Sequence, residues 1–151
     1  MRLLLTSAFL IVLLNGCSSP KTTYYTLHAD PIPPALAGAK NTRVMVGPVS
    51  LPEMIDQPQI VALGSDNQVQ VYEYNRWAGS LKSDIGRVIA ANLARDLGTS
   101  NVWNFAQSTQ TNFDYQVLVD VQNLQSKSDD SVLVDVLWTI KPANAKNKPD
   151  R

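Results

Sequence analysis

The sequence predicts an α+β fold, with a mostly antiparallel sheet packed against one main amphipathic helix and an extended tether in front of it. Over residues 81–97, apolar residues recur at intervals of three and four, which is typical of one face of a helix. In several shorter runs, apolar and polar residues alternate, which is typical of half-buried strands. Between residues 18 and 41, four prolines favour an extended backbone over regular structure.

The amino terminus has the parts of a secretory signal. Arg2 is followed by an apolar run over residues 3–14, which is too short to span a bilayer, because a spanning helix needs roughly 20 residues. The sequence Leu14-Asn15-Gly16-Cys17 then resembles a bacterial lipobox. This resemblance implies cleavage between Gly16 and Cys17, with a diacylglycerol on the sulfur of Cys17 and an acyl chain such as palmitate on its new amino group. The alternative is that Cys17 is a small hydrophobic residue at the end of a core helix.

These features divide the chain into four parts. We expect a signal peptide at 1–16, a lipidated cysteine and tether at 17–41, one α+β domain at 42–142 and a polar tail at 143–151. Ser18 in the second position of the mature chain favours, by resemblance to lipoprotein sorting, the outer membrane, with the domain facing the periplasm.

Composition argues against several classes of function. Thirteen basic and thirteen acidic residues leave no net charge for binding nucleic acid. With one histidine, His28, and one cysteine, the chain lacks the clusters that zinc sites and nucleophilic triads need. The sequence therefore predicts a protein that is not an enzyme and holds no metal or cofactor.

The first elements of the domain follow from local patterns. A brief strand is expected at residues 24–27, and another at 43–46, halted by Gly47-Pro48. Residues 59–63 and 68–74 read as a hairpin around a four-residue turn.

The helix at 81–97 begins after Ser80, a plausible N-cap, and ends at Gly98. Two further strands, at 115–122 and 132–140, form a hairpin around the polar loop at 126–130.

Candidate binding residues are few. Tyr72 and Tyr74 share one face of their strand, and with Trp77 they form either a partner-docking surface or the underside of the helix. Trp138 falls on the core side of its strand. Asp120 and Asp135 could face each other as paired carboxylates, although both fall on the polar side of their strands, which favours a solvated face.

Three segments together resemble the PqiC-like family of auxiliary lipoproteins: Tyr-Tyr-Thr-Leu at 24–27, the run at 44–61 and Asn-Arg-Trp-Ala at 75–78. The middle segment is the most specific, with Val-Gly-Pro, Leu-Pro-Glu and Pro-Gln-Ile-Val at fixed spacing. The resemblance implies a non-catalytic subunit that docks to a PqiB-like protein of the mammalian-cell-entry (MCE) type. It further implies a ring-like oligomer and a role in lipid transport between membranes that supports membrane integrity.

The family usually continues past residue 140 with another strand and a closing helix, whereas this sequence continues into Pro142 and a lysine-rich tail. That ending predicts an exposed apolar edge or a partner that covers it. The alternatives are a periplasmic lipid-binding carrier, whose helix and sheet would enclose an acyl chain, and a truncated remnant unable to dock.

Overall fold

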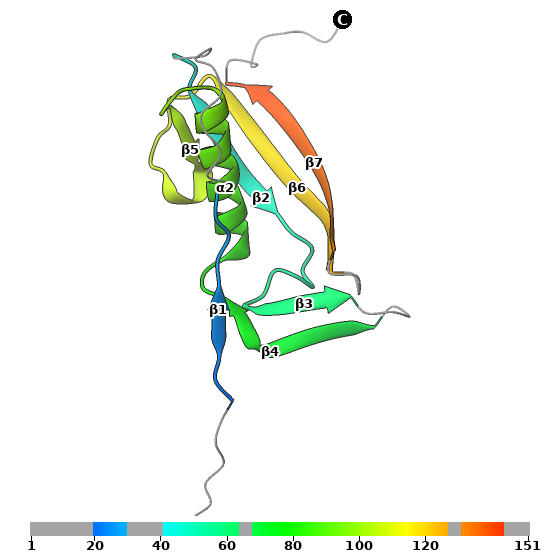
Figure 1. Ribbon diagram of the computed structural model, residues 1–151. Helices are drawn as coiled ribbons and strands as arrows, with labels where there is room; N and C mark the ends of the chain where they lie inside the picture. Colours follow the sequence, from blue (N-terminus) through cyan, green and yellow to red (C-terminus); the bar gives the residue numbers. More distant parts are fainter. Residues whose placement is uncertain (1–19, 30–40, 64–67, 127–130, 144–151) are drawn as a thin grey trace, which may run out of the picture.

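The computed structural model describes residues 20–29, 41–63, 68–126 and 131–143 (Figure 1). Several expected parts of the chain lie outside these ranges. They are the signal peptide, Cys17, most of the tether, the turn at 64–67, the loop at 127–130 and the end of the tail. The described elements are the strands β1 (Thr23–Tyr25), β2 (Val44–Ser50), β3 (Gln59–Leu63), β4 (Val69–Trp77), β5 (Val102–Asn104), β6 (Tyr115–Ser126) and β7 (Val132–Pro142), the helix α2 (Leu81–Asp96) and the 3₁₀ turn η2 (Phe105–Gln107).

The described strands form two sheets. The main sheet has the order β5-β2-β6-β7, and the small sheet has the order β1-β4-β3. Figure 1 shows α2 lying along the main sheet, with the small sheet at one end of the molecule. The α+β prediction is confirmed, and so are both expected hairpins, since β3 and β4 pair antiparallel, as do β6 and β7. The sheets are mixed, because β2 is parallel to both of its neighbours and β1 is parallel to β4.

The strand expected to stop before Gly47 continues instead to Ser50, so that prediction is wrong. Gly47 has a φ of +108°, a conformation that side chains rarely allow, and it is joined to Pro48 by a cis peptide bond. The pairing with β6 shifts register between Val46 and Val49, and the side chain of Gln116 donates a hydrogen bond to the Gly47 carbonyl. The glycine and proline therefore form a bulge within the strand.

Helix α2 matches its predicted range to within one residue. Ser80 occupies the N-cap position, although its side chain makes no capping hydrogen bond. At the other end Gly98 has a φ of +62°, its N–H donates to Arg95, and the N–H of Thr99 donates to Ala94. These two bonds form a Schellman motif, which ends the helix where the sequence predicted.

The core lies between α2, the inner face of the main sheet and the connection after β2. One cluster centres on Val44, Val46 and Ala90, which Ile89, Leu93 and Leu97 of the predicted helical stripe surround. A second cluster centres on Ile55, Val119 and Val121, with Val61 of the small sheet packed against it. The valines of β6 thus lie on the buried face, as their alternation predicted.

Part of the expected tether is fixed to the domain. The predicted brief strand is present as β1, and the N–H of Ala78 donates to the Tyr25 carbonyl at 2.7 Å. Beyond it, the Thr26 hydroxyl donates to Asp84 at 2.9 Å, and Arg87 donates to the Leu27 carbonyl at 2.7 Å. We call this set, Thr26, Leu27, Asp84 and Arg87, the arm clamp.

Asp84 is the centre of the arm clamp, and its side chain is only 16 % exposed. Burial, the largest single influence, raises the pKa of Asp84, but hydrogen bonds from Arg87, Thr26 and the Leu27 N–H together outweigh it. The pKa of Asp84 is therefore lowered from its ordinary value. A lowered native pKa means that the clamp contributes stability above the unfolded pKa, and that this contribution is lost as pH falls through the native pKa.

A first prediction concerns the contact between α2 and β5. A Cβ on Gly86 would lie 2.7 Å from Oδ1 of Asn104, a 9 %-exposed residue whose amide donates to Ser83 and whose Oδ1 accepts from Ala106. Gly86→Ala should therefore destabilise the protein by about 1–2 kcal/mol in urea unfolding, because breaking this network costs more than the gain in helix propensity of about 1 kcal/mol. The control is Gly79→Ala, since a Cβ on Gly79 has nothing within 4 Å. Equal stability of the two variants would contradict the prediction.

A second prediction concerns the arm clamp. Asp84→Asn should lower the free energy of unfolding at pH 7 by about 1–2 kcal/mol, because it removes charge-assisted hydrogen bonds. Urea unfolding at about pH 3, below the ordinary aspartate pKa of about 3.9, should show a smaller difference between this variant and the wild type, since the unfolded chain then takes up a proton at Asp84 and part of the contribution is lost. Asp135→Asn, at an exposed site on β7, should change stability at pH 7 by less than about 0.5 kcal/mol. A difference for Asp84→Asn that stays constant with pH would argue against the assignment.

Candidate docking surface on the edge of the main sheet

Strand β7 is an edge strand whose residues are all exposed. Its large apolar side chains are strongly exposed to solvent: Trp138 is 67 % exposed, Val132 61 % and Leu137 60 %. None of the other described strands pairs with its outer edge. An open edge offers backbone N–H and C=O groups to another strand, and here the flanking side chains are apolar.

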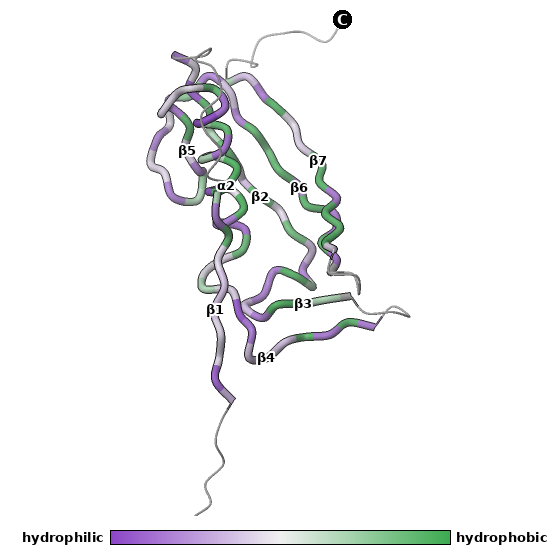
Figure 2. The backbone as a smooth tube through the Cα atoms, in the orientation of Figure 1, coloured by the Kyte–Doolittle hydropathy of each residue, from purple (hydrophilic) through white to green (hydrophobic). Residues whose placement is uncertain are grey.

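Most of this apolar surface continues the core. The pairing with β6 places Ile140 beside Val117, Trp138 beside Val119 and Val136 beside Val121, and these three β6 valines pack in the core. The side chains on the same side as α2 form what we call the β7 strip: Val132, Val134, Val136, Trp138 and Ile140. Figure 2 shows the apolar residues of β6 running alongside those of β7.

Trp138 lies on the predicted core side of its strand, but it is not buried there. The alternation assigned it to the correct side of the sheet, but α2 packs against β2 and β5, and its width does not reach β7. Trp138 therefore stands on the core side of the sheet and is exposed.

The opposite face of β7 has two more exposed leucines, Leu133 and Leu137, which the sequence analysis did not single out. Leu137 lines a depression of about 400 Å³ with residues that include Pro48, Leu118 and Thr139. The signal was present in the sequence, because residues 132–138 read Val-Leu-Val-Asp-Val-Leu-Trp, which is apolar on both sides of a strand. A strand that is apolar on both faces is typical of a position with neighbours on both sides.

The two aspartates do not meet. Asp120 lies opposite Leu137, whereas Asp135 lies opposite Asn123. Asp120 instead accepts hydrogen bonds from Ser50 and Gln122. The solvated-face interpretation agrees with this arrangement, and in the described residues no group of three His, Cys, Asp or Glu side chains could hold a metal ion.

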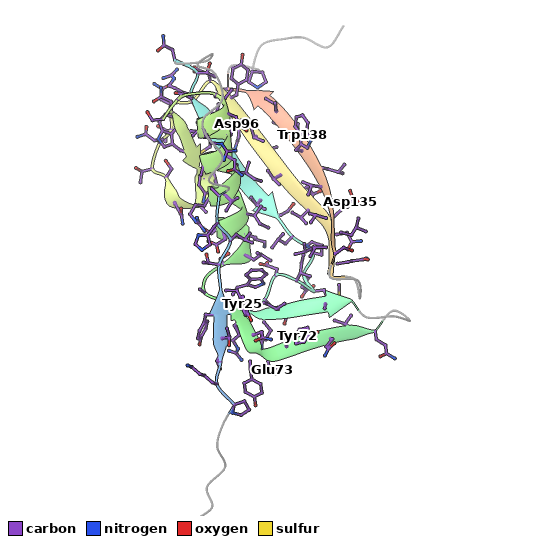
Figure 3. All side chains as sticks on the ribbon, viewed as in Figure 1. Tyr25, Tyr72, Glu73, Asp96, Asp135 and Trp138 are labelled. Carbon is purple, nitrogen blue, oxygen red and sulfur yellow. The ribbon has the colours of Figure 1, made fainter. Side chains whose placement is uncertain are left out.

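The other predicted aromatic residues lie on the small sheet. Tyr74 is 50 % exposed, whereas Tyr72 and Trp77 are partly buried. The Tyr72 hydroxyl donates to Gln70 at 3.2 Å, as expected for side chains on one face of a strand. Because α2 packs on the main sheet, these tyrosines are not its underside. Figure 3 shows Tyr72 at the small sheet and Trp138 on β7, so the structure does not bring them into one surface.

The anchoring residue Cys17 and the cleavage position after Gly16 lie outside the described residues. Within the described part of the chain, no helix is both long and apolar enough to cross a membrane.

Comparison with known proteins agrees with the sequence resemblance. Residues 25–150 match the family model described as ABC-type transport auxiliary lipoprotein component. A crystal structure of a Xanthomonas campestris protein of the DUF330 family superimposes with a TM-score of 0.58 at 16 % identity, covering 83 % of this chain and 81 % of that one. A second crystal structure, of an uncharacterized protein, gives a TM-score of 0.56 at 17 % identity, covering 85 % and 84 %.

These structural likenesses show a shared fold, and no curated protein matches the sequence. The family match covers most of the chain, including every strand of the main sheet. The protein therefore belongs to the family of ABC-type transport auxiliary lipoprotein components, the PqiC-like family.

Proposed function

We propose that this protein is a non-catalytic auxiliary subunit of an MCE-type lipid transport system, and that it docks through β7 to a PqiB-like periplasmic protein. Acyl chains on Cys17 hold it in the outer membrane, facing the periplasm. Membership of a transport auxiliary family supports an adaptor role, and the lipobox supports the anchor.

The exposed β7 strip is the observation that carries this proposal. Contiguous apolar side chains continue from the core into solvent, and exposed patches of this kind mark interaction sites. A partner strand added to the open edge would gain backbone hydrogen bonds, while its side chains would cover the strip. Trp138 lies within this surface and, being large and aromatic, is the type of residue that dominates binding energy at interfaces.

The anchor contributes to docking in a second way. Several acyl chains, each adding about 0.8 kcal/mol per buried methylene, hold the chain durably in a membrane. Confinement to that surface raises the effective concentration of β7 near any partner that spans the periplasm. A docking contact of modest intrinsic affinity then suffices.

The carrier alternative requires an enclosed apolar space. In the structure, the interface between α2 and the main sheet is filled by buried side chains, and the apolar surface that continues from this core is the open β7 strip. The open strip favours a protein partner over a single enclosed acyl chain.

A third prediction tests the docking surface. Leu137→Ser combined with Trp138→Ser should reduce recovery of the MCE partner at least tenfold in a mild-detergent pull-down of the lipidated protein, because loss of one interface hot spot costs about 2 kcal/mol or more. Both side chains are exposed, so the urea midpoint should stay close to that of the wild type. Phe105→Ser is the matched control, since Phe105 is 52 % exposed and follows β5 at the opposite edge of the main sheet. Equal recovery with all three proteins, or extracted lipid in place of a protein partner, would count against docking through β7.

A fourth prediction tests the anchor. Cys17→Ala should abolish both labelling by radioactive palmitate and recovery of the protein in the outer-membrane fraction, because the acylated residue is gone. Ser18→Ala is the control, since it leaves the cysteine in place. Outer-membrane recovery of the Cys17→Ala protein would refute the lipid anchor.

A further inference from the structure

Two exposed tyrosines, Tyr24 and Tyr74, lie on one face of the small sheet where β1 joins β4, and Tyr25 lies on the opposite face. Tyr24 is 64 % exposed, Tyr74 is 50 % exposed and Tyr25 is 42 % exposed. The pairing places Tyr24 beside Arg76 and Thr23 beside Asn75, which follows Tyr74. We call Tyr24 and Tyr74 the tyrosine patch.

The position of the patch is set by the short chain that leads to it. Only five residues separate Cys17 from Thr23, so the start of β1 lies at most about 20 Å from the anchoring residue. Strand β1 is fixed to the domain, because it pairs with β4 and because the two residues that follow it are held by the arm clamp. In Figure 1, the first described residues extend from the end of the molecule that the small sheet forms. An anchor on Cys17 thus brings this end of the domain to the membrane.

The chemistry of the patch suits a membrane surface. Tyrosine joins an apolar ring to a polar hydroxyl, and such side chains concentrate at the level of lipid headgroups. Lys21, which is exposed, adds a positive charge between the anchor and the patch, while Arg76 is paired with Glu73 at 3.4 Å. Because each tyrosine can leave its hydroxyl among the headgroups, contact with a bilayer does not bury an unpaired polar group.

We propose that the tyrosine patch rests in the phospholipid headgroup layer of the membrane that holds Cys17, and so fixes the orientation of the domain. This inference rests on the proposed acyl anchor. The small sheet then lies against the bilayer, and the end of the main sheet that contains Trp138 and Pro142 points away from it.

The test compares two matched positions in the mature, lipidated chain, reconstituted into vesicles of phosphatidylethanolamine and phosphatidylglycerol. Thr23→Cys on β1 and Thr139→Cys on β7 each receive a nitroxide label; both threonines are exposed strand residues. Collision with a water-soluble nickel complex should be severalfold weaker for the label at position 23 than for the label at 139. Adding Tyr24→Ser and Tyr74→Ser to the first variant should remove that difference, whereas Tyr115→Ser, at a 44 %-exposed site on β6, should not.

The outcomes separate the patch from the anchor. A chain that lacks acyl mass or fails to float with the vesicles overturns both proposals. A chain that floats while both labels meet the nickel complex equally overturns the tyrosine patch and leaves the anchor standing. Persistence of the difference after both tyrosine substitutions also overturns the patch.

Discussion

The width of a single helix constrains the rest of this structure. A helix with its side chains is about 10–12 Å across, whereas neighbouring strands lie about 4.8 Å apart, so one helix covers roughly two strands. The main sheet has four described strands, and α2 lies over β2 and β5. The cover of β6 comes from Ile85 and Ile89 of α2 together with Ile55 from the connection after β2 and Val61 from the small sheet. No other part of the described chain covers the sheet beyond β6, so the side chains of β7 remain exposed.

Local patterns predicted those parts of the fold that local interactions determine. The helical stripe and Gly98 defined α2, and alternation assigned Val119 and Trp138 to the same side of the sheet. Alternation gives the face on which a side chain lies but not whether another element covers that face, so it could not show that Trp138 is exposed. The end of β2 was predicted wrongly because local sequence does not show how a neighbouring strand responds. Gly47 and Pro48 usually end a strand, but here a bulge against β6 accommodates them.

The remaining features depend on contacts between distant parts of the chain. The prolines predicted an extended arm, but nothing local showed that Thr26 and Leu27 would meet Asp84 and Arg87 on the helix. The separation of Asp120 from Asp135 likewise follows from the register of β6 and β7, which shifts at the bulge after Val121. The exposed apolar edge at β7 was predicted, whereas the residues proposed from the sequence as a docking surface, Tyr72, Tyr74 and Trp77, lie on the small sheet.

The parallel pairing of β2 has a consequence for the order of folding. Val44 is partnered on one side by Val102 and on the other by Tyr115, so the most deeply buried strand has no neighbours until the last third of the chain is present. Closing loops of that length carries an entropic cost before any pairing offsets it, and such topologies fold slowly. Helix α2 and the β3–β4 hairpin can form from local contacts before β2 pairs. Until that pairing, the side chains of Val44, Met45 and Val46 remain exposed to solvent. During that interval the strand that later becomes the most buried exposes its apolar side chains, and such exposure makes a slowly folding chain prone to aggregation.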